Sequence, residues 1–179
     1  MVLKISRIDK KFLLIELLKI IVFSLGFALI TKFFIFDFIQ IEGDSMLDTS
    51  MNNEKVLINK AIYKMIETQH GDVIVFEYTN NRHIQFIKRV IAVEGDTIEV
   101  YGGKVVVNDK ILEELYIKER LVEDFKKKVV PMNCVFVMGD NRNNSKDSRF
   151  EEVGFVEYSL IKGKAIVVVW PMRSIRKII

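Results

Sequence analysis

The chain has 179 residues, of which 50% are hydrophobic, and a formal net charge of +3. This length can build one well-buried domain with a small appendage, but hardly two full domains. Positive charge gathers only over residues 126–128 and 173–177, among otherwise mixed signs, so nucleic acid is not an expected partner.

The first predicted element is an apolar helix over residues 13–36, which follows a basic tail over residues 1–12. A helix rises 1.5 Å per residue, so about 20 residues cross the ~30 Å hydrocarbon layer of a bilayer. Lys32 would lie near one end, where its ammonium can reach the headgroups. Because the tail is basic, we expect a single-pass anchor in the cell membrane, with a cytoplasmic N-terminus and residues 37–179 on the extracytoplasmic side.

Two other interpretations of this apolar segment stay open. A cleaved signal peptide has the same basic start, but this segment is long and runs directly into Ile39-Gln40-Ile41 without a small-residue cleavage site. A buried core helix would be equally apolar, although the charge at Lys32 is unusual for one. We favour the uncleaved anchor, with the lipid bilayer as a partner.

A serine followed directly by a methionine comes just after the anchor, in Gly43-Asp44-Ser45-Met46. A serine in such a loop is usually a turn residue that hydrogen-bonds its own backbone. Here it becomes a candidate nucleophile, because an anchor precedes it and a lone lysine in an apolar strand follows it.

After the anchor, short β-type runs alternate with turn residues, which is typical of an antiparallel all-β domain. The expected fold class is therefore mainly β, an antiparallel sheet domain behind an N-terminal transmembrane helix. Asn80-Asn81 and Gly102-Gly103 are predicted hairpin turns. Residues 112–128 are the least β-like stretch and are predicted to be a short helix or a mobile excursion. The predicted strands cover residues 55–59, 72–78, 84–93, 97–101, 104–107, 134–138 and 164–170.

The predicted strand over residues 84–93 carries a candidate base. Counting by twos, Lys88 shares its face with Ile84, Phe86 and Val90, so it is the only charge on an apolar face. Burial disfavours the ammonium and lowers the lysine pKa, which makes the neutral amine a usable general base. An edge-strand lysine that discourages aggregation gives the same pattern, and from this strand alone it is the simpler interpretation.

The chain contains two histidines and one cysteine. A Ser-His-Asp triad would have to use His70 or His83, which both lie beside turn residues and are expected to be exposed, although the sequence excludes neither. Cys134 lies in an apolar run without an evident activating base and is expected to be a buried core thiol. No metal or cofactor is expected, because the sequence has neither a metal-ligand cluster nor a phosphate-binding glycine loop. Lys88 is the more economical partner for Ser45.

A polar loop over residues 139–149 follows a buried strand. Its asparagine, aspartate and serine side chains form turns by hydrogen-bonding nearby backbone groups. That density predicts a rigid, internally satisfied loop, and such loops often position catalytic groups.

Three boxes occur in order: Gly-Asp-Ser-Met at 43–46, Phe-Ile-Lys-Arg-Val-Ile-Ala-Val-Glu-Gly-Asp at 86–96, and Gly-Asp-Asn-Arg-Asn-Asn-Ser-Lys-Asp-Ser-Arg at 139–149. They resemble the sequence boxes of the type I signal peptidases in their short Gram-positive form. Residues 71–76 resemble a further box, so the match runs from the anchor to about residue 154. Each box alone would be modest support, but the ordered set behind an anchor is highly specific.

The resemblance implies a membrane-bound serine endopeptidase that removes signal peptides from exported preproteins through an acyl-enzyme, without a metal or cofactor. Ser45 would be the nucleophile and its N–H an oxyanion donor, while Lys88 would be the general base. Ser145 would hydrogen-bond the Lys88 amine and orient it. Asp147 and Arg149 would pair and hold their loop in place.

The implied substrate is the signal peptide of a secreted preprotein, added as a strand between the segment before the nucleophile and the strand of the base. Candidate substrate-binding residues are Ile41, Met46, Ile84 and Phe86. Gly43 supports the oxyanion site in this scheme, but some relatives supply a second donor here from a serine hydroxyl, which this chain lacks.

One position departs from the family pattern, in which the serine box usually continues Met-x-Pro-Thr. Asp48 replaces the proline here, so substrate preference or the tuning of the dyad is expected to differ. A carboxylate near Lys88 would raise the lysine pKa, whereas a solvated turn residue would not. Two alternative functions stay open: a pilin-assembly accessory protein, non-proteolytic or specialised for pilins, and a soluble self-cleaving repressor with a Ser-Lys dyad.

Overall fold

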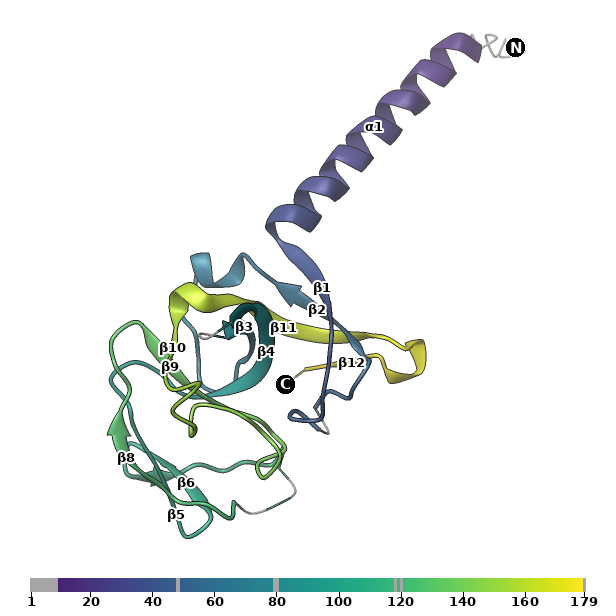
Figure 1. The fold of residues 1–179 in the computed structure, drawn as a ribbon. Coiled ribbons are helices and arrows are strands. Elements are labelled where there is room, and N and C mark those ends of the chain that lie inside the picture. The colour runs from purple at the N-terminus through teal and green to yellow at the C-terminus, as the bar shows by residue number, and fades with distance from the viewer. Residues whose placement is uncertain (1–9, 48, 79–80, 118, 120, 179) are drawn as a thin grey trace, which may run out of the picture. The chain divides into compact units, whose positions relative to one another are not determined.

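The structure is a computed structural model, and it describes residues 10–47, 49–78, 81–117, 119 and 121–178. The chain divides into two compact units, residues 1–35 and residues 36–179. The first unit contains the helix α1, Lys10–Phe34, and the second contains all the strands (Figure 1). The expected fold class, mainly antiparallel β behind one N-terminal apolar helix, is confirmed.

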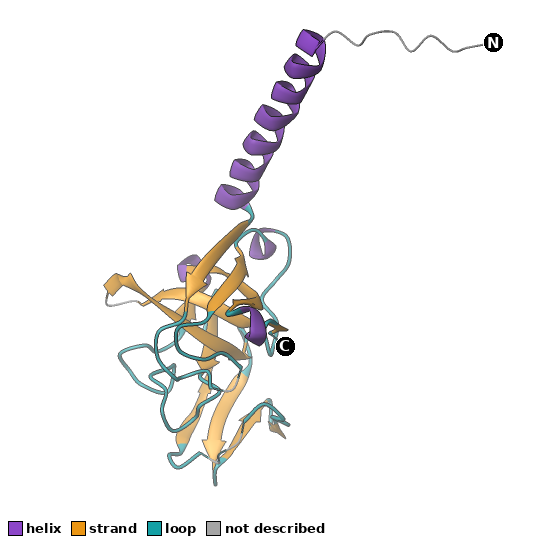
Figure 2. Cartoon of the chain, turned by 90° about the vertical axis from the view of Figure 1, so that its right-hand side faces the viewer, coloured by secondary structure: helices purple, strands orange, loops and turns teal. Residues whose placement is uncertain are grey.

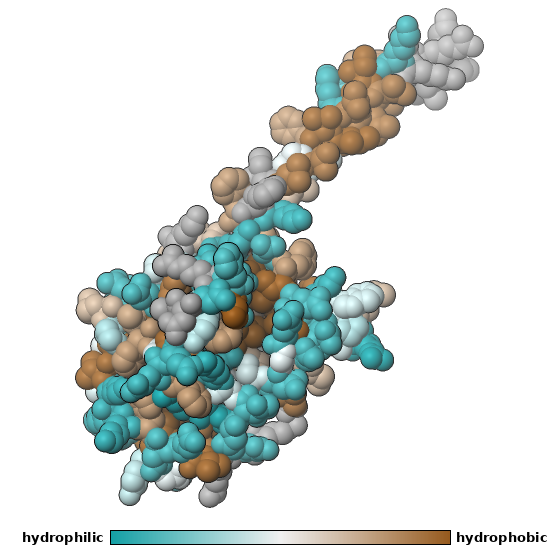
Figure 3. Space-filling view, viewed as in Figure 1, coloured by the Kyte–Doolittle hydropathy of each residue, from teal (hydrophilic) through white to brown (hydrophobic). Residues whose placement is uncertain are grey.

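Helix α1 is mainly apolar, and an ion pair between Glu16 and Lys19 lies in its N-terminal half. Its segment Lys11–Leu29 is long and apolar enough to cross a membrane, and none of its residues is buried. Figure 3 shows hydrophobic residues along the helix and hydrophilic residues towards its N-terminal end. Such an apolar surface is stable in a lipid bilayer rather than in water. The predicted bounds are slightly wrong, because α1 begins at Lys10 and ends at Phe34, and Phe36 already opens the first strand.

The regular elements of the second unit are mostly strands (Figure 2). Its larger sheet has the order β1-β2-β11-β3-β4-β9-β10, with β12 paired to β11, and the pairs are antiparallel. Short 3₁₀ turns at Ile62–Lys64, Tyr158–Leu160 and Met172–Ser174 connect some of them. The strands of this sheet are β1 (Phe36–Gln40), β2 (Lys55–Asn59), β3 (Val73–Tyr78), β4 (Asn81–Ala92), β9 (Cys134–Met138), β10 (Val156–Glu157), β11 (Ile161–Trp170) and β12 (Arg176–Lys177).

A smaller sheet has the order β7-β6-β5-β8 and lies at one end of the unit (Figure 1). Gly102 and Gly103 join β5 to β6 with φ values of 56° and 76°, which a two-residue hairpin turn requires and glycine adopts without strain. This predicted turn is confirmed, whereas Asn80 of the other predicted turn lies outside the described residues. The strands are β5 (Thr97–Tyr101), β6 (Lys104–Val107), β7 (Lys110–Ile111) and β8 (Phe125–Val129).

The prediction for residues 112–128 is wrong at their C-terminal end. The described part of this stretch contains no helix, and from Phe125 onwards it forms β8, which pairs with β5. Strand β8 is an edge strand whose three consecutive lysines are exposed, so it lacks the alternating apolar pattern by which a strand is recognised.

One buried cluster supports the chain around Ser45. It includes Ile41 and Met46 from either side of the serine, packed with residues of the central strands such as Val73, Val75 and Ile87. Burial of this apolar surface fixes the segment between β1 and β2 on one face of the larger sheet. The position of Ser45 is therefore set by the core rather than by a free loop.

Candidate active site

Ser45 lies in the serine loop, residues 41–54, which connects β1 to β2. The ends of this loop are joined by hydrogen bonds from the Ile41 N–H to the Glu54 carbonyl oxygen at 2.8 Å and from the Asn53 N–H to the Ile41 carbonyl oxygen, also at 2.8 Å. Gly43 has a φ of 92°, which few other residues adopt, and its N–H donates to Asn52 Oδ1 at 3.1 Å. The sharp turn before Ser45 therefore depends on glycine at position 43.

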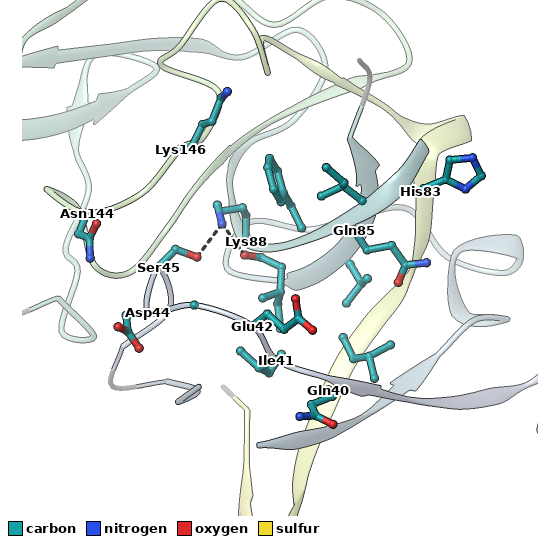
Figure 4. Close-up of a pocket in the computed structure, with 16 residues that line it drawn as sticks. Gln40, Ile41, Glu42, Asp44, Ser45, His83, Gln85, Lys88, Asn144 and Lys146 are labelled. Carbon is teal, nitrogen blue, oxygen red and sulfur yellow. Dashed lines mark hydrogen bonds between the residues drawn. The ribbon is translucent and has the colours of Figure 1, made fainter. Parts of the chain in front are cut away.

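Lys88 reaches Ser45 from β4. Its Nζ donates to Ser45 Oγ at 2.7 Å and to the Ile87 carbonyl oxygen at 3.0 Å (Figure 4). The lysine is 3% exposed, as its apolar strand face predicted. Burial lowers the pKa of Lys88 to about 8, against the charges of Asp147 and Asp140, which raise it. A large neutral fraction of this amine at mildly alkaline pH can accept the serine proton.

Neither histidine bonds to Ser45. His70 Nε2 lies 2.6 Å from Asp96 Oδ2, and His83 is exposed at the far end of the groove, with its ring away from the serine (Figure 4). Among the described residues, Lys88 is the only titratable side chain hydrogen-bonded to Ser45 Oγ. The geometry thus favours a lysine over a histidine as the partner of the serine.

Cys134 is a buried free thiol, as expected.

The polar loop over residues 139–149 contains the expected pair of Asp147 and Arg149. Arg149 Nε and Nη2 donate to the two carboxylate oxygens at 2.8 and 2.9 Å. Asp147 Oδ2 also accepts from the Gly139 N–H at 3.0 Å, and Arg149 Nη2 donates to the Arg142 carbonyl oxygen at 2.6 Å. These bonds close the loop on itself and hold it beside β9.

The expected hydrogen bond between Ser145 and Lys88 is absent. Ser145 Oγ is buried without a hydrogen-bond partner, and the Ile87 carbonyl oxygen accepts from the amine instead. Ser145 packs against Gly139, where an added Cβ would overlap both the Ser145 hydroxyl and the Ser45 carbonyl oxygen. The close approach of this loop to the nucleophile therefore requires glycine at position 139.

A groove of about 510 Å³ opens in front of Ser45 (Figure 4). Residues 39–45 form one side and residues 83–88 the other. Strand β1 is the edge strand of its sheet, and β4 pairs with β9 only from Arg89 onwards. Both sides of the groove therefore present strand edges with free backbone groups, which can hydrogen-bond an added peptide strand.

Three of the four predicted substrate-binding residues line this groove: Ile41, Ile84 and Phe86. Met46 does not, and its assignment is corrected. Its side chain is 1% exposed and points into the core, because the loop turns back after Ser45 with a hydrogen bond from the Ser50 N–H to the Met46 carbonyl oxygen. Met46 thus supports the nucleophile from beneath.

A buried ion pair that was not predicted from the sequence lies beside the dyad. Arg89 Nε and Nη2 donate to Asp140 Oδ1 and Oδ2 at 2.9 and 2.7 Å, and Asp140 Oδ2 also accepts from Thr49 Oγ1 in the serine loop. The sequence contained a signal for this ion pair, since Arg89 is a second charge within an apolar strand next to Lys88.

Asp48 lies outside the described residues, so its predicted effect stays a prediction. No metal-binding group of three or more His, Cys, Asp or Glu occurs among the residues described.

This chain is similar to proteins of a known family. The family model described as signal peptidase, peptidase S26, matches residues 14–170. Signal peptidase I S of Bacillus subtilis (strain 168) is 33% identical over 186 residues, covering 98% of this chain and 99% of that relative. Signal peptidase I of Leptolyngbya laminosa is 37% identical over 169 residues, covering 90% and 82%.

A solved structure is also similar. The crystal structure of a signal peptidase I from Enterococcus faecalis V583 has a TM-score of 0.50 and 29% identity, and the match covers 55% of this chain and 97% of that chain. The resemblance found in the sequence boxes is thereby confirmed. The chain belongs to the signal peptidase family, peptidase S26.

Proposed function

We propose that this membrane-anchored serine peptidase removes signal peptides from exported preproteins, with Ser45 as the nucleophile and Lys88 as the general base. The relatives above are named signal peptidase I, which supports this substrate class. The observation that carries the proposal is the 2.7 Å hydrogen bond between Lys88 Nζ and Ser45 Oγ at a groove between two strand edges. Family membership sets aside the self-cleaving repressor.

In the proposed acylation step, the signal peptide adds as a strand in the groove and presents its scissile carbonyl to Ser45. Neutral Lys88 takes the Oγ proton as the oxygen attacks the carbonyl carbon. The resulting oxyanion accepts a hydrogen bond from the Ser45 N–H. The Lys88 ammonium then gives its proton to the departing amine, which leaves an ester on Ser45.

In the deacylation step, Lys88 removes a proton from water, and the hydroxide attacks the ester carbonyl. The ester bond to Ser45 then breaks, the signal peptide leaves with a free carboxyl group, and the Lys88 ammonium returns its proton to Ser45 Oγ. The ammonium formed in each step has three hydrogens to donate. Ser45 Oγ and the Ile87 carbonyl oxygen take two of them, and we assign the third to the Ser145 hydroxyl, which is buried without a partner. This keeps Ser145 as an orienting residue, after rotation of its hydroxyl.

Gly43 offers little to the oxyanion in this scheme. It has no hydroxyl, and its N–H already donates to Asn52 Oδ1. The Ser45 N–H is then the main donor to the oxyanion.

Pilin precursors are a further candidate substrate class. A pilin-assembly role without cleavage would not require the hydrogen bond between Ser45 and Lys88.

The pH dependence of cleavage is expected to report Lys88. Its ammonium is inactive as a base, so kcat/KM of the full-length enzyme should rise with pH through a midpoint near the lysine pKa of about 8. The measurement is cleavage of a labelled signal peptide across the pH range in detergent. A midpoint close to about 6.5, the ordinary value of histidine, would instead indicate a histidine base.

The orientation of the anchor is a second expectation. The basic residues before α1 support an N-terminus in the cytoplasm and a β unit outside the cell. Protease added to intact cells should therefore digest the β unit, while a cytoplasmic marker protein stays whole. A β unit that became sensitive only after lysis would show the reverse topology.

A further inference from the structure

Residues 113–117, here called the strap, follow β7, and within them an apolar side chain is exposed next to a buried carboxylate. Leu115 is 98% exposed, whereas the Glu114 side chain is 5% exposed. Ordinary packing does the opposite, because a buried carboxylate is costly unless it is paired and hydrogen-bonded. The position of the strap is therefore set by the partners of its polar side chains.

Those partners are two buried arginines. Glu114 Oε2 accepts from Arg142 Nη1 at 2.6 Å, and Glu114 Oε1 accepts from Arg142 Nη2 and from the Tyr116 hydroxyl. The Tyr116 ring lies over the Arg89 guanidinium, with Cζ 4.0 Å from the ring centroid. Burial and the Glu114 carboxylate raise the pKa of Tyr116, so its hydroxyl remains a donor. The strap thus binds the Arg142 guanidinium through two hydrogen bonds to Glu114 and the Arg89 guanidinium through the face of the Tyr116 ring.

Both arginines hold the turn at residues 139–140. Arg142 Nε donates to the Gly139 carbonyl oxygen at 3.0 Å. Arg89 forms its two hydrogen bonds with the Asp140 carboxylate, and its Nη1 donates to the Gly71 carbonyl oxygen at 2.9 Å. The Arg142 side chain is 0% exposed and that of Arg89 is 2% exposed, so these bonds are shielded from water.

The turn at residues 139–140 also supports the nucleophile, Ser45. The Asn141 N–H donates to the Ser45 carbonyl oxygen at 3.0 Å, and the Asp140 carboxylate accepts from Thr49 in the same serine loop. Gly139 packs directly against the Ser45 carbonyl. A displacement of the turn would therefore move Ser45 relative to Lys88.

We propose that Tyr116 and Glu114 are positioning residues for the cleavage reaction. They act through Arg89 and Arg142 on the turn at residues 139–140, and the turn keeps Ser45 Oγ within hydrogen-bond range of Lys88. Neither strap residue lines the groove. Since a misplacement of about 1 Å can lower a rate by about 100-fold, their loss should act on kcat rather than on substrate binding. This inference rests on the proposed roles of Ser45 and Lys88.

The test compares three full-length variants in detergent, with kcat and KM measured on a labelled signal peptide. Tyr116→Leu removes the ring face over Arg89 and should lower kcat on the order of tenfold, with KM within about twofold. Tyr116→Phe keeps the ring and should restore kcat to within about threefold of wild type. Leu115→Ala changes the neighbouring exposed residue and should leave both constants unchanged.

Wild-type kcat in a folded Tyr116→Leu enzyme would overturn the proposal, and so would a rise in KM with kcat intact. If Tyr116→Leu does not fold, Glu114→Gln is measured instead. It keeps the size of the side chain but removes its charge and one of the two oxygens that accept from Arg142. Wild-type kcat in Glu114→Gln, or loss of folding in both variants, would overturn the proposal. Ser45→Ala is measured alongside. An active Ser45→Ala enzyme would contradict the proposed function itself. If Ser45→Ala is inactive and Tyr116→Leu has wild-type kcat, only the proposed role of the strap is contradicted.

Discussion

Replacing Lys88 with arginine is expected to lower kcat/KM for signal-peptide cleavage on the order of 10⁴-fold. Arginine keeps the positive charge and a long side chain, but its guanidinium does not deprotonate in proteins and has no lone pair to accept the serine proton. The measurement is cleavage of a labelled preprotein by the full-length variant, with circular dichroism to confirm its fold.

Lys162→Arg is the matched control. Lys162 Nζ pairs with Glu77 at 2.6 Å outside the groove, and this pair tolerates a guanidinium, so the control should cleave like wild type. Wild-type cleavage by Lys88→Arg would refute the lysine base. Loss of cleavage in a folded His83→Ala enzyme, with Lys88→Arg still active, would move the base to the histidine.

A methyl group at position 139 is expected to damage the site as severely. In Gly139→Ala the new Cβ would overlap the Ser45 carbonyl oxygen, a backbone atom that moves only with the nucleophile. Overpacking of this kind costs about 1–3 kcal/mol of stability. The accompanying shift of Ser45 should lower kcat by roughly 100-fold. Thermal unfolding and cleavage kinetics of the full-length variant measure the two effects.

Gly163→Ala separates the loss of stability from the loss of catalysis. Its Cβ would overlap the Asn59 carbonyl oxygen between β11 and β2, away from the residues that line the groove. It should lower Tm as Gly139→Ala does, while the folded enzyme keeps its kcat. A folded Gly139→Ala enzyme with wild-type kcat would show that the contact between positions 139 and 45 does not position the serine.

Much of the β fold could be predicted because several strands carry regular apolar patterns between turn residues. The predicted bounds of β2, β5, β6 and β9 coincide with those observed. Strand β1 could not be separated from the end of α1, since the apolar run of the helix continues into it. Strand β8 was missed because its exposed lysines carry no alternation.

The candidate site was predictable only where one residue stands out in its own segment. Lys88 did so, because a single charge lay on an apolar strand face. The partners of buried charges could not be predicted, since sequence does not tell which of several acidic residues meets Arg142 from a distant segment. Side-chain direction in the loops was equally beyond reach, which is why Met46 was assigned to the groove and Ser145 to a hydrogen bond it does not make.

The most direct test of the dyad is cleavage of a labelled preprotein by purified full-length enzyme and by its Ser45→Ala variant, with the N-terminus of the product sequenced. The geometry of Ser45 and Lys88 predicts a single cut at the end of the signal peptide by the wild type, and no cut by a folded Ser45→Ala enzyme. Binding of the preprotein without any cut by the wild type, or undiminished cleavage by Ser45→Ala, would contradict it.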